Sequence, residues 1–152
     1  MNVKSVAFGS DHRGYPLKVK LIESLKQKGY QIKDFGTSSE QSCDYSDFGL
    51  AAAQAVGSGA YERGIVICHT GIGMSIAANK VKGVRAALCH SIEAAELTRL
   101  HNDSNVLAMG AGFIDEKTAE AVCLKWLTTE FEGGRHANRI QKISDFERKQ
   151  SC

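Results

Sequence analysis

Residues 64–80 read Gly-Ile-Val-Ile-Cys-His-Thr-Gly-Ile-Gly-Met-Ser-Ile-Ala-Ala-Asn-Lys, and they carry the clearest signal of the fold. The apolar run that ends at Cys68 is typical of a buried strand, and the small residues after the turn are typical of a helix. Gly71 and Gly73 let the chain turn sharply between the two. A strand joined to a helix in this way is the repeating part of a parallel sheet.

Cys68 lies where this strand would reach the carboxyl edge of the sheet. The first backbone N–H groups of the following helix have no intrahelical acceptor, so they would attract an anion and favour the thiolate form of Cys68. A sugar-derived enediolate, a phosphate or a carboxylate could bind there. The alternative is a buried cysteine that ends a strand above an ordinary tight turn.

The rest of the chain repeats this alternation of short apolar runs and longer helical patterns. We expect strands at 3–8, 31–35, 63–68, 84–89 and 106–109, and helices at 17–28, 47–56, 74–81, 92–100 and 118–131. Residues 1–152 are therefore predicted to form a single α/β domain. It would be a Rossmann-like three-layer sandwich, with a five-stranded parallel sheet and helices on both faces. Ligands of such folds bind outside the carboxyl ends of the strands.

Residues 135–150 are left over once the five strand–helix units are complete. Ile140, Ile143 and Phe146 recur at helical spacing among many charged residues, which predicts an amphipathic C-terminal helix. Its apolar face needs a partner, and we expect that partner to be a second subunit at a dimer interface.

Composition narrows the class of protein. The chain has 152 residues, of which 43% are hydrophobic and 24% charged, the balance of one globular domain. The net charge of +2 comes from basic residues scattered along the chain, so neither nucleic acid nor a membrane is an expected partner. Charged residues interrupt the N-terminus before a signal-peptide core could form, and no apolar run approaches the roughly 20 residues of a membrane span. We expect a cytoplasmic protein.

The cysteines show no CxxC spacing and are odd in number, which argues against both a disulfide framework and a zinc site. They are predicted to be reduced thiols, and Cys89 and Cys123 are most simply core residues. The full set is Cys43, Cys68, Cys89, Cys123 and Cys152.

Polar residues collect where the expected strands end. Asp11 and His12 follow the first strand, and His90 follows the fourth. Because the carboxyl ends of parallel strands share one edge, these residues should converge with Cys68. The alternative for Asp11 and His12 is a helix-capping carboxylate beside a surface histidine.

Two further groups of residues lie on expected helices. His101 and Asn102 end one helix, where a histidine could simply complement the helix dipole. Arg135 and Arg139 lie one helical turn apart behind a glycine pair, a spacing suited to binding a phosphate. A solvated helix face would look similar.

Three well-known motifs are excluded by the residues after Cys68. A cysteine phosphatase needs arginine six positions after its nucleophile, where this chain has Met74. A dinucleotide fingerprint of the G-x-G-x-x-G type needs a third small residue, where this chain has Ile76, and the Gly-Lys-Ser/Thr of a P-loop does not occur.

Taken together, the residues resemble the type B ribose-5-phosphate isomerases and their galactose-6-phosphate isomerase relatives, over essentially the whole chain. The matching segments are Gly9-Ser10-Asp11-His12 with Gly14, Asp34-Phe35-Gly36-Thr37, Asp44-Tyr45, Gly64-Ile65-Val66-Ile67-Cys68, Thr70-Gly71-Ile72-Gly73, Ile76-Ala77-Ala78-Asn79-Lys80, Arg99, His101-Asn102-Asp103, Asn105-Val106-Leu107-Ala108, Gly133-Gly134-Arg135-His136 and Arg139.

The resemblance implies a homodimer, with a tetramer as the alternative, whose active sites combine residues of both subunits. It also implies isomerisation of a phosphorylated sugar, as in the pentose phosphate pathway, without metal or organic cofactor. Cys68 matches the catalytic base that moves a proton through an enediolate. The other matches are the oxyanion-binding loop (Thr70, Gly71, Gly73, Ser75), the ring-opening groups (Asp11, His101), the sugar contacts (Tyr45, Asn102) and the phosphate contacts (His12, Arg135, Arg139).

One position departs from the family. Relatives commonly carry an arginine shortly after the fifth strand as a further phosphate ligand, where this chain has Gly112. The predicted function is isomerisation of ribose 5-phosphate to ribulose 5-phosphate. The alternatives are isomerisation of a related hexose phosphate or an unphosphorylated sugar, and a non-catalytic sugar-phosphate sensor on the same fold.

Overall fold

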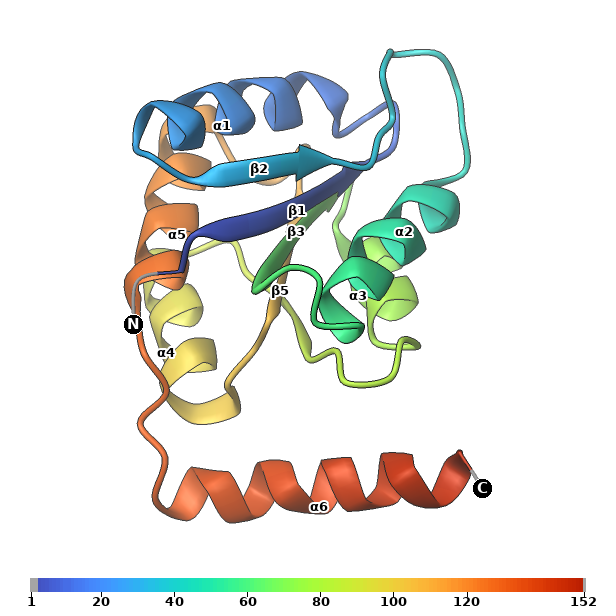
Figure 1. The fold of residues 1–152 in the computed structure, drawn as a ribbon. Coiled ribbons are helices and arrows are strands. Elements are labelled where there is room, and N and C mark those ends of the chain that lie inside the picture. Colours follow the sequence, from blue (N-terminus) through green and yellow to red (C-terminus); the bar gives the residue numbers. More distant parts are fainter. Residues whose placement is uncertain (1–2, 152) are drawn as a thin grey trace.

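The computed structural model describes residues 3–151, and its centre is one parallel sheet (Figure 1). The strands lie in the order β2-β1-β3-β5-β4. Their bounds are β1 Ser5–Ser10, β2 Gln31–Asp34, β3 Arg63–Cys68, β4 Ala86–Leu88 and β5 Val106–Gly110. The predicted five-stranded parallel α/β fold is confirmed.

The burial of each strand follows from its position in the sheet. The central strands β1, β3 and β5 are buried almost throughout, as a strand covered on both faces must be. The edge strands β2 and β4 are short and largely accessible. In the β3–β5 register Cys68 pairs with Gly110, and in the β1–β3 register Ser10 pairs with Ile67. The carboxyl ends of the three central strands are therefore level.

Helices cover both faces of the sheet (Figure 1). One layer holds α1 Tyr15–Gln27, α4 Ile92–Asn102 and α5 Glu116–Thr128, which pack with the sheet around the buried Trp126. The other layer holds α2 Tyr45–Gly57 and α3 Ile72–Ala78, whose alanines and Met74 pack against the opposite face. Small side chains bring α2 and α3 close to β3, which carries Cys68.

Only β3 and the C-terminal helix keep their expected bounds, and the other elements begin or end one to three residues away, as β4 and α3 illustrate. β4 covers only Ala86–Leu88 because the backbone at Arg85 turns aside, its N–H donating to Asn105 Oδ1 at 2.8 Å and its carbonyl accepting from Asn105 N at 3.0 Å. Helix α3 begins at Ile72, two residues early, because Gly71 adopts the left-handed conformation that starts it. The early start brings the first turn of α3 next to the thiol.

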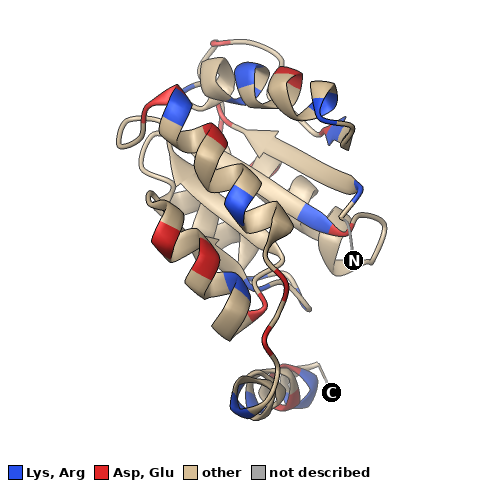
Figure 2. Cartoon of the chain, turned by 90° about the vertical axis from the view of Figure 1, so that its left-hand side faces the viewer, with Lys and Arg blue, Asp and Glu red and all other residues tan. Residues whose placement is uncertain are grey.

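Helix α6, Arg135–Gln150, lies apart from the three layers (Figure 1) and is seen nearly end-on in Figure 2. It meets the body at its first turn, where the rings of His136 and His101 stack, and near its far end, where Glu147 Oε1 accepts from the Gly83 N–H at 3.0 Å. Ile143 and Phe146 leave 59% and 63% of their surface exposed. Its apolar face is therefore largely uncovered within this chain, although the dimer contact expected there stays a prediction.

Charges are mixed in sign over the outer faces of the helices, and the sheet is nearly free of them (Figure 2). Within residues 3–151, no helix has the length and apolar character needed to cross a bilayer. Cys43, Cys68, Cys89 and Cys123 are free thiols, and Cys89 and Cys123 are buried, as expected for core residues. Cys152 lies outside the described residues.

Candidate active site

Cys68 ends β3 with only 4% of its surface exposed. Its Sγ accepts a hydrogen bond from the Gly71 N–H at 3.2 Å, so the turn folds back over the thiol. Gly71 has a φ of +76°, and a Cβ there would lie 2.6 Å from the backbone carbon of Met109. Only glycine fits this position, and the close approach of the backbone holds the N–H on the sulfur.

The loop after Cys68 gathers backbone donors and hydroxyl groups. Thr70 Oγ1 accepts from the Ile72 N–H at 3.1 Å. Gly73 and Ser75 follow in the first turn of α3, whose leading N–H groups have no intrahelical acceptor. A Cβ on Gly73 would lie 2.7 Å from the Tyr45 ring, so this glycine allows Tyr45 of α2 to cover the loop.

Asp11 lies next to this loop, beyond the end of β1. Its N–H donates to the Ile67 carbonyl at 3.2 Å, one residue before Cys68. Its Oδ1 accepts from the N–H groups of Arg13 at 2.9 Å and Gly14 at 3.0 Å. These bonds fix a carboxylate that is 6% exposed, and they leave Oδ2 free of those two donors.

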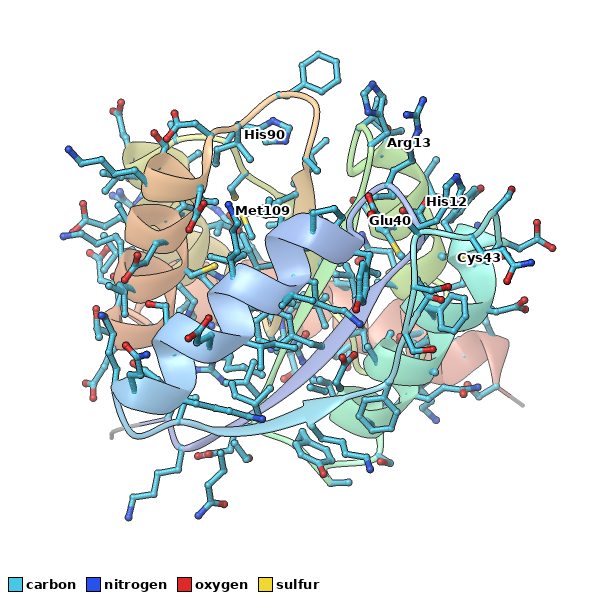
Figure 3. The ribbon with its side chains drawn as sticks, turned by 90° about the horizontal axis from the view of Figure 1, so that it is seen from above. His12, Arg13, Glu40, Cys43, His90 and Met109 are labelled. Carbon is cyan, nitrogen blue, oxygen red and sulfur yellow. The ribbon has the colours of Figure 1, made fainter. Side chains whose placement is uncertain are left out.

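His12 is half-buried on the same edge, where its Nδ1 accepts from the Cys43 N–H at 3.3 Å. Seen from above, His12, Arg13 and Cys43 lie on one side of the edge and His90 on the other (Figure 3). The predicted convergence of polar residues at the carboxyl edge is therefore present. Arg13 is exposed beside His12 and adds a cation to this edge.

An aromatic cluster at the same edge was not expected. His90 Nε2 accepts from the Gly110 N–H at 2.9 Å, and its ring stacks on Phe113 at 6.0 Å. Phe113 is 65% exposed, and His69 lies 6.1 Å from its ring. A Cβ on Gly112 would lie 2.4 Å from the His69 ring. The imidazole thus fills the space where a side chain at residue 112 would begin, and only the folded chain could reveal this.

His101, Asn102, Arg135 and Arg139 lie elsewhere. Helix α4 starts after β4 and ends before β5, so His101 and Asn102 are carried to the amino edge of the sheet. They line a cavity of about 900 Å³ between α6 and the body, together with Arg139. The structure therefore brings together the predicted residues around Cys68, but it separates these four from them within one chain.

At the amino edge, the structure shows a contact that the sequence did not predict. His101 stacks on His136, with ring centroids 4.4 Å apart and planes 16° apart, and both Nε2 atoms lie near Glu132 Oε2, at 4.0 and 3.8 Å. The candidate ligand atoms of these three residues lie within 4.8 Å of one another. Yet lone pairs in nearly parallel ring planes do not converge on one point, so the rings as placed do not form a metal site.

The comparisons with known proteins all indicate one family. The family model described as Ribose/Galactose Isomerase matches residues 6–143. Ribose-5-phosphate isomerase B of Escherichia coli is 40% identical over 149 residues, which cover 98% of this chain and all of that protein.

Solved structures superpose closely as well. Ribose-5-phosphate isomerase B of Clostridium thermocellum has a TM-score of 0.94 at 50% identity, covering 96% of this chain and 99% of that one. The Mycoplasma genitalium enzyme, solved with bound ribulose 5-phosphate, has a TM-score of 0.92 at 39% identity, covering 95% and 96%.

Proposed function

The chain belongs to the ribose/galactose isomerase family and is an aldose–ketose isomerase of sugar phosphates, and on this premise we propose that it interconverts ribose 5-phosphate and ribulose 5-phosphate with Cys68 as the base. The observation that carries the proposal is the thiol, enclosed at the carboxyl edge with the Gly71 N–H on its sulfur at 3.2 Å. The bound ribulose 5-phosphate of the Mycoplasma genitalium enzyme supports the choice of substrate.

In the proposed reaction the Cys68 thiolate takes the proton from C2 of the open-chain aldose. The electrons of the C2–H bond form the C1–C2 double bond, and the carbonyl oxygen O1 becomes the oxyanion of an enediolate. Cys68 then returns its proton to C1, while the O2 hydroxyl loses its proton to O1 and becomes the ketone. Thr70, Gly73 and Ser75 would supply hydrogen-bond donors to the oxyanion, whereas the Gly71 N–H is held on the Cys68 sulfur in this structure. Removing one preorganised donor of this kind typically costs about 100- to 1000-fold in rate.

The sugar must first open, because the aldose is mostly a closed furanose. Asp11 takes the proton of the O1 hydroxyl, the C1–O4 bond breaks, and His101 gives a proton to O4. Asp11 lies beside Cys68, whereas His101 lies at the far edge of the same chain. We therefore assign His101 to a second copy of the chain.

The same copy would supply Asn102 to the sugar and both Arg135 and Arg139 to the phosphate, opposite His12 and Tyr45. The uncovered apolar face of α6 supports a homodimer, since Ile143 and Phe146 are more than half exposed in one chain. In the dimer, the arginines at the start of α6 would reach the partner's Cys68 loop.

The decisive test of the base is Cys68→Ala, with Cys89→Ala as the matched control. Cys89 is also a buried thiol that follows a strand end, and burial raises its pKa to about 11. We expect Cys68→Ala to lose at least about 100-fold in kcat while it still binds ribulose 5-phosphate, and Cys89→Ala to stay active. More than about a tenth of the wild-type kcat in Cys68→Ala would exclude the role as base.

A second experiment, proton exchange with deuterated water, separates an enzyme from a sugar-phosphate sensor. In deuterated water, an enolising enzyme labels its substrate at the carbon from which the proton is taken. A sensor would bind ribose 5-phosphate and leave every carbon-bound proton in place.

Shared active sites are tested by mixing two inactive variants. Cys68→Ala and His101→Ala protomers, after subunit exchange, form heterodimers in which one site keeps both residues. Activity should recover toward half of the wild-type value per heterodimer. If exchange is verified by mass spectrometry and no activity returns, the sites are not shared in this way.

A further inference from the structure

Glu132 lies in the loop between α5 and α6 and contacts the last turn of α4 at the amino edge of the sheet. Its N–H donates to the Leu100 carbonyl at 3.1 Å, which fastens this loop to the last turn of α4. Its Oε2 lies 4.0 Å from Nε2 of His101, which belongs to that same turn. The carboxylate is thus placed beside the His101 ring by the backbone, although its own side chain is 57% exposed.

The ring of His136 stacks against the ring of His101. His136 is 4% exposed, and its Nε2 makes no hydrogen bond within the described residues, lying 3.8 Å from the same Glu132 oxygen. Burial, followed by the nearby charges of His101 and Arg135, lowers the pKa of His136. His136 therefore stays neutral near pH 7 and offers His101 a flat ring without a competing charge.

The other charged groups around His101 are mostly basic. Helix α6 brings Arg135 and Arg139, whose charges also act on His136. The cavity beside His101 is lined further by Lys80, Lys82, Arg85 and Glu147. Most of these groups are cationic, and Glu132 places a carboxylate oxygen 4.0 Å from Nε2 of His101.

We propose that Glu132 and His136 are positioning residues for ring opening, which hold the His101 imidazole in place and balance its charge when it carries the proton destined for O4. The inference rests on the proposed function. A carboxylate that orients a histidine and stabilises its protonated form is a recurrent catalytic device. In this proposal both residues act through His101 and not by contact with the sugar.

The test compares a cyclic substrate with an acyclic one. Erythrose 4-phosphate has no free hydroxyl that could close a five-membered ring on C1, so it reaches Cys68 without ring opening. We expect Glu132→Gln to lower kcat/KM for ribose 5-phosphate by about 10- to 100-fold and to leave that for erythrose 4-phosphate unchanged. Glu96→Gln, which removes the carboxylate that pairs with Lys125 in the middle of α4, should change neither.

Two additional variants separate positioning from structural damage. His136→Ala removes the ring that stacks on His101, so it should lower kcat/KM for ribose 5-phosphate and not for erythrose 4-phosphate. His136→Phe keeps a flat ring at this position and should restore activity toward ribose 5-phosphate. His101→Ala should show the same selectivity in a stronger form. Circular dichroism confirms that each variant is folded.

The dependence of rate on enzyme concentration supplies a second readout. An enzyme that no longer opens the ring uses only the free aldehyde, so its velocity bends toward the uncatalysed ring-opening rate as more enzyme is added. Wild-type velocity should rise linearly past that rate, and Glu132→Gln velocity should bend there. This readout decides the question even if erythrose 4-phosphate is a poor substrate.

The inference is overturned if Glu132→Gln lowers kcat/KM equally for ribose 5-phosphate and erythrose 4-phosphate. It is also overturned if the velocity of Glu132→Gln rises linearly past the uncatalysed ring-opening rate with the wild-type slope. If wild-type protein isomerises neither sugar phosphate, the proposed function fails instead. The two failures are therefore distinguishable.

Discussion

Replacing Gly112 with arginine tests the phosphate site at the position where this chain departs from its relatives. An added Cβ would lie 2.4 Å from Cε1, 2.8 Å from Nδ1 and 2.9 Å from Nε2 of His69. The arginine stem can therefore enter only if the exposed His69 ring swings away from Phe113. The sequence alone predicts that Gly112→Arg lowers KM for ribose 5-phosphate, and the structure adds that His69 opposes the change.

The expected changes in stability and in phosphate affinity follow from the contacts that Gly112→Arg breaks and makes. A tilted aromatic pair such as His69 and Phe113 contributes about 0.5–1.5 kcal/mol, so Gly112→Arg should lower the free energy of unfolding by about 1 kcal/mol. A charge-assisted bond from guanidinium to phosphate contributes about 1.5–3 kcal/mol, which is roughly a 10- to 100-fold change in affinity. In the single variant, displacement of His69 offsets part of this gain. The double variant with His69→Ala should show all of it.

Steady-state kinetics with ribose 5-phosphate and with free ribose measure the effect. KM for ribose 5-phosphate should fall in Gly112→Arg and further in the double variant, with kcat little changed, because the contact stabilises substrate and transition state alike. Gly112→Gln is the matched control, since it displaces His69 without adding charge. The reasoning is refuted if both arginine variants keep the wild-type KM, if the glutamine variant matches them, or if wild-type protein already binds ribose 5-phosphate at low micromolar concentration.

Three further predictions concern stability and the thiol loop. Gly71→Ala should abolish isomerisation and lower thermal stability, measured by calorimetry, because its φ of +76° and the Met109 backbone leave no room for a side chain; normal activity would contradict this account of the loop. Trp126→Phe should lower the free energy of unfolding by about 1–3 kcal/mol in urea titrations, because it leaves the buried Ser104 hydroxyl without its 2.8 Å donor; adding Ser104→Ala should recover part of the loss. Because the pKa of His136 is lowered in the folded protein, the unfolded chain binds this proton more readily, and the free energy of unfolding should fall as pH drops below about 6.5. His136→Phe should weaken that fall, and identical pH profiles of the two proteins would refute the assignment.

Much of the fold can be predicted from the sequence, because the signals are local. The apolar run before Cys68, the glycines after it and the small residues of α3 each act within one or two turns of chain, so the strand, the bend and the helix follow from neighbouring residues. Asp11 and His12 could also be assigned to the site, since parallel strands bring their carboxyl ends to one edge. The family resemblance supplied the roles of the residues on α4 and α6.

Tertiary structure alone decided the remaining relations, because they depend on contacts between segments far apart in sequence. The strand order places β5 between β3 and β4, which brings Gly110 beside Cys68 and sets the His69 ring over Gly112. The direction of α4 carries His101 to the opposite edge, where the loop before α6 places Glu132 and His136 against it. No local pattern encodes these neighbours, since packing of whole helices against the sheet determines which side chains meet.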